Sequence, residues 1–186
     1  MALSDNELII NAQNGDVLAF EELMYRYDKM VLRIALKYTG NSDDSKDIYQ
    51  DVFIKVFKGL SNFQFKSEFS TWLFRIATNT CITFKRKYNM TKHFSLNDDE
   101  DSNFLSSIPD DESLPDKLVA NSEQGEKIDA ALNNLSPNQK MSFLLKHYEG
   151  YKIREIAEMM NCKEGTIKKY LFEAVRKLKL QLENTY

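Results

Sequence analysis

The stretch from 151 to 180 constrains the fold most, because its apolar residues predict two short helices joined by a turn. Each helix has one apolar face at helical spacing, made by Ile153, Ile156, Ala157 and Met160 in the first and by Ile167, Leu171, Ala174 and Leu178 in the second. Asn161 lies between them and tolerates the left-handed backbone of a tight turn. The second helix leaves an outward face for a partner, made by Gly165, Lys169, Phe172, Glu173 and Arg176.

A two-helix unit of this size cannot cover its own apolar faces and needs further helices. The segment 136–139, Ser-Pro-Asn-Gln, predicts the start of one with an N-cap serine, a first-turn proline and a capping-box glutamine. Residues 127–135 supply another. An ordinary hairpin in a helical bundle would show the same spacing. Between 162 and 186, however, six Lys and Arg oppose three acids, which favours a helix that enters the major groove of DNA.

Four more helices are predicted upstream of this unit. A capping box at 4–7 begins the first, which ends at Gly15. Helical spacing predicts the second at 16–39, the third at 42–59 and the fourth at about 67–88.

The third of these helices is too apolar for a single buried face. One stripe consists of Ile48, Val52 and Val56, and a second beside it of Tyr49, Phe53 and Phe57. The second stripe either contacts a partner protein or marks a helix that is central in its bundle. The periodicity alone leaves both interpretations open.

The fourth helix combines basic and aromatic residues. No acid occurs between 84 and 97, where Lys85, Arg86 and Lys87 lie, and aromatic residues from Phe63 onward precede or alternate with these cations. Single-stranded nucleic acid needs cations for its phosphates and flat apolar surfaces for its bases. Most of these aromatic residues, Trp72 above all, are also explained as ordinary core.

Helical periodicity lapses between 97 and 126, where ten acids accompany Lys117 as the one cation, a local charge of -9. This composition predicts a flexible linker that either only solvates itself or mimics nucleic acid. We therefore expect an all-α protein of two small helical domains. The first is a four-helix domain at 1–94 and the second a helix-turn-helix domain at 125–186, and an acidic linker at 95–124 joins them.

Composition excludes several classes of protein. Among 186 residues, 42% hydrophobic, no apolar run approaches the roughly 18 residues of a membrane span. The chain start lacks the basic and apolar regions of a secretory signal, and the two cysteines suggest no disulfide framework, so we expect a cytoplasmic protein. Cys81 and Cys162, with His93 and His147, show no metal-ligand spacing. No metal or cofactor is expected.

Three segments resemble, in the right order, signature segments of bacterial RNA polymerase sigma factors of the extracytoplasmic-function (ECF) group. They are 44–53 (DSKDIYQDVF), 69–79 (FSTWLFRIATN) and 156–168, from Ile156-Ala157 through Gly165-Thr166-Ile167-Lys168. The resemblance covers nearly the whole chain. It implies a transcription initiation factor without enzymatic activity, which binds the clamp coiled coil and flap of core polymerase and directs it to promoters. It also implies an anti-sigma factor as a partner.

Carried over residue by residue, the resemblance implies three binding surfaces. Docking on core polymerase is implied for Asp47, Gln50, Asp51, Phe53 and Ile54. Binding of the melted -10 element, with one base in a pocket of the loop 61–66, is implied for Asn62, Phe63, Lys66, Arg75, Asn79, Lys85 and Arg86. Contact with the -35 duplex is implied for Lys163, Thr166, Lys168, Lys169, Phe172 and Arg176.

The chain departs from the family pattern at both DNA-binding surfaces. Gln64-Phe65 stands where the family commonly has Arg-Gly, and frequent arginines are replaced by Tyr170, Glu173 and Val175. Two other classes of function were weighed. A stand-alone helix-turn-helix regulator would need a dimer surface, for which the sequence has no heptads. An enzyme acting on nucleic acid would need an acid/base or metal-binding pair, and the acids have no such spacing.

Overall fold

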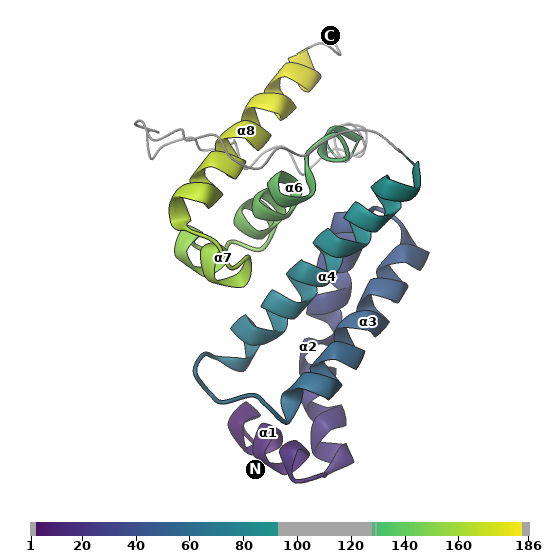
Figure 1. Cartoon of the computed structure of the whole chain (residues 1–186), viewed down its shortest axis with the longest axis vertical. Helices are drawn as coiled ribbons and strands as arrows, with labels where there is room; N and C mark the ends of the chain where they lie inside the picture. Colours follow the sequence, from purple (N-terminus) through teal and green to yellow (C-terminus); the bar gives the residue numbers. More distant parts are fainter. Residues whose placement is uncertain (1–2, 93–127, 129, 184–186) are drawn as a thin grey trace.

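The computed structural model describes residues 3–92, 128 and 130–183. These residues form helices and connecting loops without a strand (Figure 1). The helices are α1 (Asp5–Gln13), α2 (Val17–Thr39), α3 (Ser42–Leu60), α4 (Phe69–Lys92), α6 (Pro137–Phe143), η2 (Leu144–Tyr148), α7 (Ile153–Met159) and α8 (Glu164–Glu183). The predicted all-α class is confirmed. The predicted linker at 95–124 lies outside the described residues.

The N-terminal domain is a bundle of three long helices with a short helix at one end. α2, α3 and α4 lie side by side, and α1 packs at the end where the loop between α3 and α4 also lies (Figure 1). The predicted start of α1 and both predicted ends of α2 are confirmed, whereas α1 ends at Gln13 and not at the predicted Gly15. Ser4 and Glu7 form the capping box, Asp16 caps the start of α2, and Gly40 ends it with a φ of 69°.

Close packing at the end of α3 shapes the loop that follows. A Cβ added to Gly59 would lie 3.1 Å from Trp72 Cζ2, closer than carbon atoms normally approach. Glycine therefore lets the last turn of α3 lie directly against the indole ring. Trp72 is half-buried and packs on the core, as expected from its sequence context.

The C-terminal domain contains the predicted helix-turn-helix. Ser136 and Gln139 form the capping box that begins α6, and Asn161 has a φ of 52° in the turn between α7 and α8. Both predictions are confirmed. The π-helical turn η2 was not predicted, since its wider hydrogen-bonding pattern has no sequence signature. Residues 128 and 130–132, within the helix predicted at 127–135, are helical.

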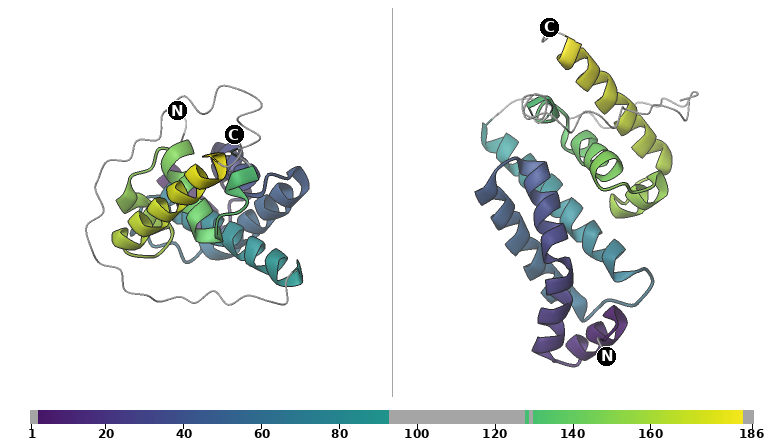
Figure 2. Two further views of the ribbon diagram at one scale, coloured as in Figure 1. Left: turned by 90° about the horizontal axis from the view of Figure 1, so that it is seen from above. Right: turned by 180° about the vertical axis from the view of Figure 1, so that it is seen from behind.

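The two domains pack directly against each other. α6 and α7 contact α4, and both views place the C-terminal domain along that helix (Figure 2). The ring of Phe74, 1% exposed, lies 5.5 Å from the ring of Tyr151, centroid to centroid. Arg33 Nη2 lies 2.5 Å from Glu149 Oε2, and Arg75 Nε donates to the carbonyl oxygen of Glu158 at 3.1 Å. The interface thus combines an apolar centre with charged contacts.

Candidate nucleic-acid interface

The outer face of α8 carries most of the residues predicted to contact duplex DNA. Of the six, Lys163, Phe172 and Arg176 are exposed, and Thr166, Lys168 and Lys169 are half-buried. Phe172 keeps 44% of its surface exposed. The opposite face of α8 is buried at Ile167, Ala174 and Leu178. The helix therefore presents an aromatic ring and cations on a rigid support.

Glu173 does not join that open face, although its spacing predicted that it would. Gln139 Nε2 donates to Glu173 Oε2 at 2.5 Å, and Lys177 Nζ donates to Gln139 Oε1 at 3.1 Å. A single α6 side chain therefore holds two charged side chains of α8. Tyr170 also turns toward α6, where Asn138 Nδ2 donates to its hydroxyl at 3.3 Å. Hydrogen bonds to α6 thus narrow the outward face of α8.

The exposed face of α4 carries the predicted strand-binding residues. Arg75, Asn79 and Arg86 are exposed at helical spacing, and Lys85 is half-buried. Arg75 also donates to the backbone of α7. The C-terminal domain therefore occupies one end of this face, while Asn79 and Arg86 stay exposed.

The loop between α3 and α4 has one aromatic ring buried and one exposed. Phe63 is 7% exposed, and its ring centroid lies 5.9 Å from that of Phe69 and 5.2 Å from that of Trp72. Phe65 is 42% exposed and has a φ of 55°, which is rare for a bulky residue. Phe65 is one of the aromatic residues that precede the basic part of α4, but it was not among the residues predicted for the base pocket. No spacing rule distinguishes these two phenylalanines, because the left-handed backbone decides which ring points outward.

The remaining predicted loop residues, Asn62 and Lys66, are both exposed. They lie on either side of the exposed Phe65. An amide, an aromatic ring and a cation thus lie within one short loop. Such side chains can hydrogen-bond and stack on an unpaired base and neutralise the phosphates beside it.

α3 presents the residues predicted to bind core polymerase. Asp47, Gln50, Asp51 and Ile54 are exposed, Ile54 with 50% of its surface. Phe53 is half-buried, and its ring lies 4.6 Å from that of Tyr49, centroid to centroid. Phe57 is 63% exposed and was not among the predicted residues. The second apolar stripe is thus divided. Tyr49 and Phe53 pack against the core, whereas Phe57 stays largely exposed, with one contact to the ring of Phe20 at 5.2 Å between centroids.

An open cleft of about 540 Å³ lies where α4 meets α7 and the following turn. Its lining residues are Arg75, Arg154, Ala157, Glu158, Asn161, Cys162, Lys163 and Glu164. Cys162 is half-buried at this cleft, whereas Cys81 is fully buried within α4. Burial raises the pKa of the Cys81 thiol to about 12.

The part of the chain that the structure describes has neither a metal-binding cluster nor a membrane-spanning helix. No three His, Cys, Asp or Glu side chains gather there in a group that could hold a metal ion. None of the helices there has the length and apolar character needed to cross a bilayer.

Comparison with known proteins assigns both domains. Residues 23–90 match the family model for sigma-70 region 2, and residues 125–178 match that for sigma-70 region 4. The chain is 32% identical over 174 residues to the ECF RNA polymerase sigma-E factor of Escherichia coli K12, covering 92% of this chain and 91% of that protein. The chain belongs to the ECF group of the sigma-70 family. It is a transcription initiation factor and not an enzyme.

Other relatives of this sigma factor agree in sequence and fold. It is 28% identical over 173 residues to the RNA polymerase sigma-H factor of Pseudomonas aeruginosa, covering 91% of this chain and 89% of that one. The structure of CnrH in complex with the cytosolic domain of CnrY matches with a TM-score of 0.66 and 19% identity, covering 98% and 99% of the two chains. RpoE from Bartonella quintana, solved with the anti-sigma factor NepR, matches with a TM-score of 0.63 and 23% identity, covering 90% and 98%. These two structures support the fold.

Proposed function

We propose that this ECF sigma factor docks on core RNA polymerase through α3, binds the melted -10 element with α4 and its preceding loop, and binds the -35 duplex with α8. One observation carries the proposal. Exposed stripes of polar, basic and aromatic residues occur on three helices, each within a matched sigma region.

The outer face of α8 supports contact with the -35 duplex. A helix that enters the major groove places side chains from one face against base edges. Arg176 has the planar donors that recognise guanine, and the exposed ring of Phe172 suits the methyl group of thymine. Lys163, in the turn before α8, is suited to a phosphate.

The loop before α4 supports capture of an unstacked base. Asn62 supplies hydrogen-bonding groups, Phe65 an exposed ring and Lys66 a cation. Asn79 and Arg86 continue along α4 and contact the same strand. In this arrangement Phe63 supports the pocket from beneath, and Phe65 forms its surface.

The exposed stripe of α3 supports docking on the polymerase clamp. Asp47, Gln50 and Asp51 offer acidic and polar contacts, while Ile54 and Phe57 offer apolar surface that the bundle does not cover. A protein interface commonly combines an apolar centre with a polar rim. We therefore add Phe57 to the proposed docking residues.

Simultaneous contact with both promoter elements requires the two domains to separate. At a rise of 3.4 Å per base pair, elements roughly 20 base pairs apart lie roughly 70 Å apart along the helix axis. Domains that pack on each other cannot reach both, and the bond from Arg75 Nε to the Glu158 carbonyl breaks when they separate. The segment 95–124 reaches at most about 100 Å when fully extended, which is enough for the span.

An anti-sigma factor is the proposed regulatory partner. The RpoE chain that this fold resembles was solved with the anti-sigma factor NepR. A protein that stabilises the packed domains would keep Arg75 engaged and the promoter surfaces too close together to bind both elements.

Reconstituted transcription tests the proposal. The purified chain, with core polymerase, is expected to bind promoter DNA specifically and to make the -10 region reactive to permanganate, whereas neither component does so alone. Gln50→Lys combined with Asp51→Lys is expected to weaken capture of core polymerase while the chain stays folded. Specific duplex binding without core polymerase would favour a stand-alone helix-turn-helix regulator instead.

A further inference from the structure

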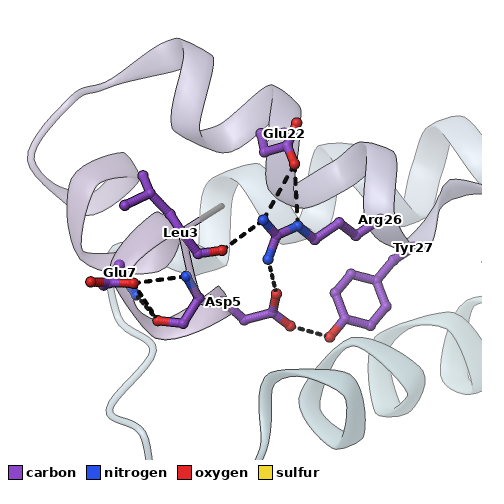
Figure 3. Close-up of polar contacts among 7 residues, drawn as sticks. Leu3, Asp5, Glu7, Glu22, Arg26 and Tyr27 are labelled. Carbon is purple, nitrogen blue, oxygen red and sulfur yellow. Dashed lines mark hydrogen bonds and ion pairs between the residues drawn. The ribbon is translucent and has the colours of Figure 1, made fainter. Parts of the chain in front are cut away.

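α1 lies before residues 23–90, which match the sigma-70 region 2 model, yet polar contacts fix it firmly to α2 (Figure 3). Arg26 Nη1 donates to Asp5 Oδ1 at 2.7 Å, and Arg26 Nη2 donates to the carbonyl oxygen of Leu3 at 2.7 Å. The hydroxyl of Tyr27 donates to the other oxygen of Asp5. The beginning of α1 is therefore held at a defined position on the bundle.

From this position, the last residue of α1 reaches the loop between α3 and α4. Gln13 Nε2 donates to the carbonyl oxygen of Leu60 at 2.9 Å and to that of Phe63 at 3.0 Å. An amide nitrogen carries two hydrogens, so this group is fully used. Leu60 is the last residue of α3, and its carbonyl oxygen also accepts from the backbone N–H of Phe63 at 3.0 Å. The carbonyl of Phe63 lies three residues further along, in the loop. One side chain thus fixes the backbone on both sides of Asn62.

The end of the loop next to α4 also contacts the unit of α1 and α2. The ring of Tyr27, whose hydroxyl bonds to α1, lies 5.3 Å from the ring of Phe69 at the start of α4, centroid to centroid. The exposed ring of Phe65 lies 5.1 Å from the ring of Phe63, whose carbonyl Gln13 holds. The unit of α1 and α2 therefore contacts both ends of the loop that carries Asn62, Phe65 and Lys66.

We propose that Gln13 is a positioning residue for the -10 base pocket. It fixes the carbonyls of Leu60 and Phe63, and through them the direction in which Asn62 and the Phe65 ring face the extruded base. This inference rests on the proposed function of the loop. It assigns to α1, which precedes the matched region, a part in promoter melting and in base preference.

A stabilising role alone would have a different consequence. If Gln13 served only to attach α1, its loss would lower the stability of the domain and weaken the binding of all -10 sequences equally. A positioning role changes which base is preferred at the pocket, because a displaced amide and ring no longer fit one base better than the others.

The experiment uses the full chain assembled with core polymerase and single-stranded -10 oligonucleotides randomised at each position in turn. Gln13→Met keeps the length of the side chain and removes both donors. It is expected to weaken binding of the preferred oligonucleotide by up to about tenfold, because the two hydrogen bonds no longer favour the loop conformation that binds the base, and to flatten the preference at one position. Asn6→Ala replaces an exposed side chain on the same helix. This control is expected to leave the binding affinity and the base preference unchanged.

A second variant of Gln13 keeps the test decisive. Gln13→Asn keeps the amide but is shorter by one methylene, so it reaches one carbonyl at most, and an intermediate loss of preference is expected. This variant decides the matter if Gln13→Met does not fold. An unchanged base preference in the folded Gln13 variants would overturn the inference.

A loop variant separates this inference from the proposed function beneath it. Asn62→Ala combined with Phe65→Ala is expected to abolish the base preference. If it does so while the Gln13 variants keep the preference, only the role of Gln13 is wrong. If the loop variant also keeps the preference, the loop is not the base pocket and the proposed function fails there.

Discussion

The two candidate DNA surfaces are built in different ways. The α8 surface is one face of a regular helix, and Phe172 and Arg176 stay exposed on it while the domains are packed together. The strand-binding surface combines α4 with a loop in which Phe65 has a left-handed backbone, and one of its cations, Arg75, is bonded to the other domain. Duplex DNA needs only a helix that fits its groove, whereas an extruded base needs a shaped pocket. In the closed chain, the first surface is therefore available and the second is partly occupied.

The largest effect is expected from removing the apolar contact that keeps the strand-binding surface occupied. Phe74→Ala deletes a ring that is 1% exposed and packed near Tyr151. The free energy of unfolding is expected to fall by about 3–5 kcal/mol, and the C-terminal domain to lose its contact with α4. Urea denaturation measures the first effect. Phe172→Ala, at a ring 44% exposed, is the control and is expected to change stability by under about 0.5 kcal/mol. Equal losses of unfolding free energy in Phe74→Ala and Phe172→Ala would contradict the packing of Phe74 described above.

The next effect tests which aromatic ring of the loop meets DNA. Phe65→Ala is expected to weaken holoenzyme binding to a single-stranded -10 oligonucleotide by about 1–3 kcal/mol, the contribution of one base stacked on a ring. Its effect on stability is expected to be small because the ring is exposed. Tyr25→Ala, at an exposed ring on α2, is the control. If both variants bind the oligonucleotide equally well, Phe65 does not stack on a base.

An effect of similar size is expected on the duplex-reading side. Arg176→Ala is expected to remove a base preference of about 1–3 kcal/mol within the -35 element. Lys179→Ala, also at an exposed cation, is expected to weaken the binding of all -35 sequences equally. It is also expected to reduce the dependence of binding affinity on salt concentration by about one unit of slope. Holoenzyme binding to a randomised -35 library distinguishes the two. If the ranking of bases is the same in both variants, α8 does not read sequence through Arg176.

The smallest effect is expected at the charged contact between the domains. Glu149→Gln removes the charge that pairs with Arg33. The Glu149 side chain is 7% exposed and that of Arg33 57%, so Arg33 stays hydrated after the change and the loss of interdomain stability is expected to be about 1 kcal/mol. A slightly larger fraction of molecules is then expected to have separated domains. Because separation uncovers α4, the factor without polymerase is expected to bind single-stranded -10 DNA slightly more tightly. Energy transfer between fluorophores on the two domains measures the opening. Lys46→Gln, at an exposed pair within α3, is the control, and equal energy transfer in both variants would contradict a closing role for Glu149.

The fold was largely predictable because its helix ends are encoded by local chemistry. Ser4 with Glu7 and Ser136 with Gln139 form the predicted capping boxes, and Asn161 takes the predicted left-handed turn. These interactions involve residues only a few positions apart. A sequence pattern can therefore reveal them without knowledge of the tertiary structure.

The composition of the candidate site was less predictable, because contacts distant in sequence decide it. Helical spacing puts Glu173 on the outward face, but Gln139 of α6 holds its carboxylate. Phe63 and Phe65 look equivalent in sequence, and the aromatic cluster buries only the first. The two domains contact each other through Phe74 and Tyr151, among other residues. These two residues are far apart in the sequence, so no local pattern predicts that they pair.

The different burial of the two cysteines provides a practical tool. Thiolates, not thiols, react with maleimides, and Cys81 is both inaccessible and held as a thiol at neutral pH. Cys162 is half-buried at the cleft beside Arg75. Burial also raises the pKa of the Cys162 thiol, but this side chain keeps access to solvent, so a thiol-reactive dye is expected to label Cys162 before Cys81 without replacement of either native cysteine. Emission from a dye at this cleft is expected to change when the two domains separate.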